Sequence, residues 1–71
     1  MGLMDDQPPA PRIARAIRIT AGVSQAAMAA ELGCHRTTVN RWEMYARRPR
    51  GELAKRYAAL LRELEGSVKL P

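Results

Sequence analysis

Apolar residues recur at steps of three and four between residues 10 and 21, which is the spacing of one helix face. The positions are Ala10, Ile13, Ala14, Ile17 and Ala21. Pro11 suits an early helical position, and Gly22 accepts the left-handed conformation that follows a last turn. The pattern predicts a first helix that starts near Pro11 and ends at Gly22.

A second helix is expected to begin after Ser24, whose side chain can cap the free amides of a first turn. Val23 before this cap and Met28 after it can form a hydrophobic staple. The helix runs to about Leu32. Gly33 then ends it, since glycine accepts the conformation of a helix terminus.

A third helix is predicted over about 36–44 and a last one over about 51–65, separated by a loop at 45–50 that contains Pro49. Leucines and a tyrosine line one side of the last helix, at Leu53, Tyr57, Leu60, Leu61 and Leu64. No stretch shows strand-like alternation of any length. The fold class is therefore all-α, with a flexible leader at 1–9, one domain at 10–66 and a short tail at 67–71.

The second and third helices are separated only by Gly33, Cys34 and His35. A three-residue turn that contains glycine sets the second helix of such a pair steeply across the first. The small side chain of Ala29 suits a close crossing of the two helices. The sequence therefore predicts a compact four-helix bundle that contains a helix-turn-helix.

The two sides of the third helix differ in chemistry. With about 100° of rotation per residue, five side chains fall within an arc of roughly 140°. These are Arg36, Thr37, Asn40, Arg41 and Met44. Val39, Trp42 and Glu43 lie on the opposite side. Arginine can pair with guanine and asparagine with adenine in the major groove, so the polar side fits DNA recognition.

The charge distribution supports the same interpretation, DNA recognition. The net charge is +5, from 12 Lys and Arg against 7 Asp and Glu. Between residues 35 and 50 there are five arginines and one acid, Glu43. A basic zone of this kind attracts polyanions, although a solvated charged face would give the same composition.

The sequence lacks the features that are typical of other classes of protein. The chain of 71 residues has one cysteine, Cys34, so no internal disulfide can form and a reducing cytoplasm is expected. No apolar run is long enough to span a bilayer, and the start is unlike a signal peptide. Cys34 and His35 alone are too few ligands for zinc. Without a nucleophile–base pair, paired carboxylates or a phosphate loop, we expect no enzyme, no metal, no cofactor and no small-molecule ligand.

Spaced matches across residues 18–49, RITAGVSQAAMAAELGCHRTTVNRWEMYARRP, resemble the helix-turn-helix domain of the phage Cro and repressor proteins, the Xre-like family. The resemblance is carried by Arg18, Gly22-Val23-Ser24-Gln25, Met28-Ala29, Leu32-Gly33, Thr38-Val39, Trp42-Glu43 and Pro49. It implies a lambda-repressor-like fold. It also implies an internal ion pair between Arg18 and Glu43.

The resemblance further implies two groups of DNA contacts. Base-reading positions are Arg36, Thr37 and Arg41, with Asn40 beside them. Phosphate contacts are expected from Gln25, Thr38, Arg47, Arg48 and Arg50, and His35 at a helix start can add another.

Three positions depart from the family pattern. Tyr45 replaces a usual glycine, and both packing and a phosphate contact are open to it. His35 stands where Ser or Thr often caps the third helix. Residues 67–71 are too short for the fifth helix that carries dimer contacts in many members.

The expected function is a sequence-specific regulator of transcription that binds double-stranded DNA, a Cro-like repressor of a phage or mobile element. We expect it in a bacterial cytoplasm, on an operator, with a homodimer on a palindromic site. The alternative is a protein-interaction module, such as an antitoxin or anti-repressor, that binds a partner through its apolar last helix and tail. Co-purification of a partner, with absent or salt-insensitive DNA binding, would favour this alternative.

Overall fold

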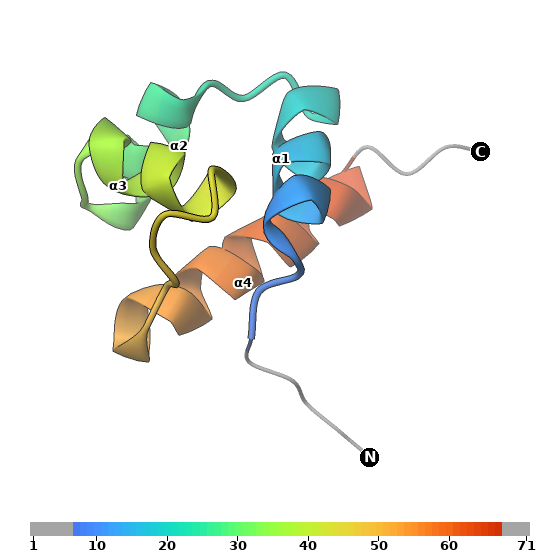
Figure 1. Ribbon diagram of the computed structural model, residues 1–71. Helices are drawn as coiled ribbons and strands as arrows, with labels where there is room; N and C mark the ends of the chain where they lie inside the picture. The colour runs from blue at the N-terminus through green and yellow to red at the C-terminus, as the bar shows by residue number, and fades with distance from the viewer. Residues whose placement is uncertain (1–6, 68–71) are drawn as a thin grey trace, which may run out of the picture.

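The computed structural model describes residues 7–67, and the predicted leader and tail fall largely outside this range. Within it the chain forms four helices and no strand: α1 (Pro11–Thr20), α2 (Gln25–Leu32), α3 (Arg36–Glu43) and α4 (Gly51–Ser67). Helices α2 and α3 lie together on one side of the molecule and α1 on the other, and α4 runs beneath them (Figure 1). The predicted all-α fold of four helices is confirmed.

Helix α2 has a strong stop signal as well as a cap. Ser24 Oγ accepts a hydrogen bond of 3.0 Å from the amide of Ala27 at its start. At its end Gly33 takes a left-handed conformation with φ of 73°. The amides of Gly33 and Cys34 then donate to the carbonyls of Ala30 and Ala29. This pairing is a Schellman motif, which turns the chain sharply toward α3.

The core lies where α4 crosses beneath the other helices. Its largest fully buried side chains are Met28, Val39, Tyr57 and Leu61. The ring of Trp42 packs on that of Tyr57 with a centroid separation of 4.5 Å and a tilt of 41°. This contact joins α3 to α4 and thereby fixes which side of α3 faces inward.

Two helix ends differ from the sequence prediction. Helix α3 ends at Glu43, and Met44 is its C-cap. Helix α4 continues through Gly66 to Ser67, beyond the expected end at residue 65. Gly66 is not among the glycines with positive φ, so it continues the helix instead of ending it. Ser67 Oγ also donates to the carbonyl of Leu64 at 3.1 Å.

Candidate nucleic-acid interface

Helix α3 divides into a buried side and an outward side. Val39, Trp42 and Glu43 are buried, with exposures of 0%, 4% and 4%. Arg36 and Arg41 are exposed, while the shorter Thr37 and Asn40 between them are half-buried. The four side chains predicted to read bases therefore share one accessible surface. We call this set, Arg36, Thr37, Asn40 and Arg41, the recognition face.

A buried ion pair fixes the inward side of α3 to α1. Arg18 Nε donates to Glu43 Oε2 at 2.6 Å and Arg18 Nη2 donates to Glu43 Oε1 at 2.9 Å, a bidentate pairing. Arg18 Nη1 also donates to the carbonyl of Val23 at 2.8 Å. Burial favours a higher pKa for Glu43, but hydrogen bonds from Arg18 and Gln25 and the charge of Arg18 outweigh it and lower the pKa. The carboxylate is therefore ionised and acts only as an acceptor.

Gln25 connects this ion pair to the recognition face. Its Nε2 donates to Glu43 Oε1 at 3.0 Å and to Asn40 Oδ1 at 3.2 Å. An amide nitrogen has two hydrogens, so both donors of this side chain are used inside the protein. In this conformation Gln25 has no side-chain donor left for a phosphate. Its expected phosphate contact then depends on its backbone amide.

The start of α2 has first-turn amides without an intrahelical acceptor, whereas the start of α3 is capped by the side chain of His35. The cap of α2 satisfies the amide of Ala27, while those of Gln25 and Ala26 precede it in a first turn that has no intrahelical acceptors. At α3, His35 Nδ1 accepts a hydrogen bond of 3.1 Å from the amide of Thr37. His35 thus serves as the N-cap in place of Ser or Thr, and its Nε2 is the ring nitrogen left to donate.

The turn after α3 has a left-handed residue at the position where the family usually has glycine. Tyr45 adopts φ of 65° and is 66% exposed. The amides of Ala46 and Arg47 both donate to the carbonyl of Arg41, at 2.9 and 3.2 Å. The exposure shows that Tyr45 adds little to the core. Its backbone conformation is instead set by the closing turn.

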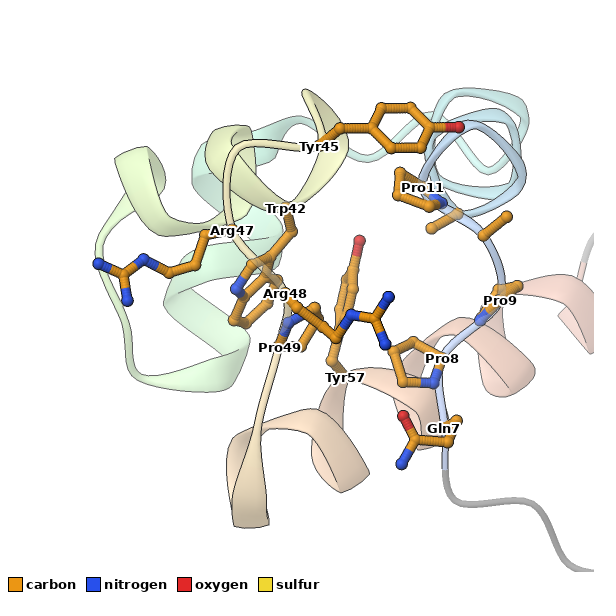
Figure 2. Close-up of a pocket in the computed structure, with 12 residues that line it drawn as sticks. Gln7, Pro8, Pro9, Pro11, Trp42, Tyr45, Arg47, Arg48, Pro49 and Tyr57 are labelled. Atoms are coloured by element: carbon orange, nitrogen blue, oxygen red, sulfur yellow. The ribbon is translucent and has the colours of Figure 1, made fainter.

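Arg47 and Arg48 are adjacent in sequence but extend in different directions. They border a cavity of about 440 Å³ that also has Trp42 and Tyr57 in its wall. In Figure 2 the guanidinium of Arg47 extends away from this cavity on the side of α3, whereas that of Arg48 extends across it toward Pro8. Arg47 is therefore the better placed of the two to act together with the recognition face.

The stretch at 35–50, which contains α3 and the loop after it, has exposed arginines and no exposed acid. All five arginines between residues 35 and 50 are exposed: Arg36, Arg41, Arg47, Arg48 and Arg50. The one acid of this stretch, Glu43, is buried and paired with Arg18. The unbalanced positive charge suits a polyanion such as DNA.

Comparison with protein families assigns the chain to one of them. The family model described as helix-turn-helix matches residues 15–65, which include both central helices and most of α4. The chain belongs to the Cro- and Xre-like helix-turn-helix family. No curated protein and no solved structure matches it significantly.

As a member of this helix-turn-helix family, the protein is a DNA-binding regulator, and the family is generally non-enzymatic. Within residues 7–67 no helix has the length and apolar character needed to cross a membrane. The same part of the chain has no group of three or more His, Cys, Asp or Glu placed to hold a metal ion.

The contact between Gln25 and Asn40 is not predicted by the sequence. The sequence predicts a phosphate contact for Gln25 and a base contact for Asn40, yet the two side chains are hydrogen-bonded to each other. The two residues lie 15 positions apart, and the contact exists only because the turn at Gly33 brings the start of α2 beside α3. A signal was nevertheless present, since an acid on the inward side of α3 requires donors, and glutamine can supply one.

Proposed function

We propose that this helix-turn-helix protein is a sequence-specific transcription regulator of the Cro-like phage or mobile-element type, which places α3 in the major groove of an operator. The observation that carries the proposal is the division of α3. Its inward side is anchored by Trp42 and Glu43, and its outward side offers the recognition face to a ligand. A helix fits the major groove, where every base pair presents its own pattern of donors and acceptors.

In this proposal Arg36 and Arg41 contribute most of the base discrimination. Both side chains are exposed and carry no ion pair within the described residues, so their guanidinium groups are available to guanine O6 and N7. Thr37 lies between them and can contact an adjacent base. The role of Asn40 depends on Gln25 and is argued below.

Phosphate contacts would hold the protein in register on either side of the groove. The first amides of α2, at Gln25 and Ala26, point out of a positive helix end, and His35 Nε2 offers one more donor. Thr38 on α3, and Arg47 and Arg50 in the loop that follows it, supply further donors. Arg48 is also predicted to contact a phosphate. Its side chain extends across the cavity toward Pro8 instead, so it would have to turn outward to join the others (Figure 2).

A single domain of this size reads only a few base pairs, so two copies on a two-fold site would supply the specificity of an operator. The two α3 helices would then lie about 34 Å apart, one turn of the duplex. A palindrome among selected DNA sequences would support this arrangement. Binding of one copy to an asymmetric site would contradict it.

The test combines selection of bound sequences from a random DNA pool with titration of variants. Arg36→Ala and Arg41→Ala are each expected to weaken the selected site by about 1–3 kcal/mol and to relax preference at one base pair. Arg62→Ala, an exposed arginine on α4, is the matched control and should leave the preference unchanged. Equal losses on selected and scrambled DNA would show that these arginines do not read bases.

The alternative role as a protein-interaction module, an antitoxin or anti-repressor, depends on the apolar stripe of the last helix and on the tail, of which only Ser67 lies among the described residues. In the described residues that stripe is used by the core. Tyr57 and Leu61 are buried, while Leu53, Leu60 and Leu64 pack against the same cluster. No observation in residues 7–67 favours this alternative over DNA binding.

A further inference from the structure

We infer that Gln25 is a positioning residue that decides which bases Asn40 accepts. The inference rests on the proposed entry of α3 into the major groove. It assigns Gln25 a role in specificity that is separate from any phosphate contact of its backbone. A continuous series of hydrogen bonds runs from the buried ion pair through Gln25 to the recognition face.

The direction of each hydrogen bond in this series follows from the chemistry of its first member. Glu43 is a buried carboxylate that can only accept, so Gln25 must turn its amide nitrogen toward it. The second hydrogen of that nitrogen then points to Asn40, which must present its oxygen. Asn40 Nδ2 is consequently left as the donor at the recognition face.

Reversal of the Asn40 amide is unfavourable as long as Gln25 is present. A flipped Asn40 would bring Nδ2 against Gln25 Nε2, two donors face to face. It would also leave a half-buried hydrogen of Gln25 without an acceptor, and an unsatisfied polar group in such a place is costly. Asn40 therefore keeps its nitrogen toward DNA.

If Asn40 can only donate a hydrogen bond to DNA, it cannot bind favourably to cytosine. Guanine, adenine and thymine all present an acceptor in the major groove, at N7, O6 or O4, whereas cytosine presents only its N4 amino donor. The structure thus assigns Asn40 a preference against cytosine, with Gln25 enforcing it.

The experiment begins with the full chain and the operator obtained by selection. Asn40→Ala identifies the base pair that this residue meets, as the one position where preference disappears. The affinity ratio between the preferred base and cytosine is then measured there. We expect about a tenfold ratio for the unchanged protein, the scale of one lost hydrogen bond and one unsatisfied donor.

Substitution of Gln25 should reduce this ratio. Gln25→Met keeps the length of the side chain but donates nothing, so Asn40 can flip and the ratio should fall to about twofold. Glu31→Gln, at the far end of α2, is the control and should keep the full ratio.

The outcomes separate this inference from the proposed function. Unchanged discrimination against cytosine in folded Gln25→Met would overturn the role of Gln25 while leaving DNA reading intact. A protein without preference at any base pair would overturn both. If circular dichroism shows that Gln25→Met does not fold, Gln25→Ala provides the test, because it also donates nothing to Asn40 but leaves room for water at Glu43 Oε1. A retained preference against cytosine in that variant would contradict the inference.

Discussion

At the scale of single residues, Glu43 accepts hydrogen bonds from two other elements. Arg18 on α1 donates to both of its oxygens, and Gln25 at the start of α2 donates to one. A buried carboxylate is costly without partners, so each donor offsets part of its desolvation. Glu43 therefore ties three helices together at one point behind the recognition face.

Glu43→Ala is expected to destabilise the fold by about 3 kcal/mol or more, because it leaves the charge of Arg18 buried and unpaired. The side chain of Arg18 is 9% exposed, so water cannot replace the lost carboxylate. Denaturant unfolding at neutral pH measures the change. Arg18→Met combined with Glu43→Leu should lose less than Glu43→Ala alone, and an unchanged midpoint in the single variant would refute the role of the pair.

Tyr45 illustrates a local strain at the same scale. It holds φ of 65°, a conformation in which a residue with Cβ pays an energetic penalty that glycine avoids. Its exposed ring contributes little packing energy to the fold. The turn that reverses the chain after α3 imposes the conformation.

Tyr45→Gly should therefore stabilise the protein by about 1 kcal/mol, seen as a higher melting temperature. Met44→Gly is the matched control, since Met44 is similarly exposed at 65% but has φ of −95°. That neighbouring change should lower stability, because glycine there only adds freedom to the unfolded chain. A fall in melting temperature for Tyr45→Gly would mean that its ring contributes more than its strain costs.

At the scale of elements, the short connection from α2 to α3 sets the geometry of the site. The Schellman motif at Gly33 ends α2, and the His35 cap starts α3 two residues later. Both signals are local, so the turn has little freedom to vary. The rigid turn places Gln25 beside Asn40, on which the order of hydrogen bonds behind the recognition face depends.

Removal of the cap tests how much α3 relies on it. His35→Ala should cost about 1 kcal/mol of stability, because the amide of Thr37 loses its acceptor. His35→Ser restores an oxygen acceptor and should be at least as stable as the unchanged protein. Thermal unfolding of the two variants compares them, and equal losses in both would show that the ring of His35 acts by something other than capping.

At the scale of the whole molecule, the acid and the arginines around α3 are divided between interior and surface. The acid of the α3 region is paired inside, and its five arginines lie outside. Such an arrangement attracts DNA from a distance and draws much of its affinity from released counterions. Binding should therefore be strongly dependent on salt.

The salt dependence gives a quantitative expectation. With about six phosphate contacts, the logarithm of the binding constant should fall with a slope near −5 against the logarithm of salt concentration. Arg47→Ala should reduce that slope by about 1, whereas Arg48→Ala, whose side chain lies toward Pro8, should change it little. Titrations of DNA binding at several salt concentrations measure the slope for each variant. A larger effect from Arg48 would contradict the orientation shown in Figure 2.

The local signals of the sequence account for the helices and for much of the surface. Ser24 and Gly33 determine the ends of α2 because their effects act within one turn of the chain. The rotation per residue places Arg36 and Arg41 on one side of α3 and Trp42 on the other, and the structure agrees. Gly66 shows the limit of such signals, since a glycine permits a helix end without requiring one.

By itself, the sequence determined the all-α class, the helix-turn-helix and the outward side of α3, because each depends on residues within a few positions of one another. Only the tertiary structure decided that Gln25 donates to Asn40 and that Arg47 and Arg48 diverge. Such contacts depend on how separate helices and loops come together in three dimensions. A hydrogen bond requires atoms about 3 Å apart, and no spacing along the chain specifies a distance that fine between two helices.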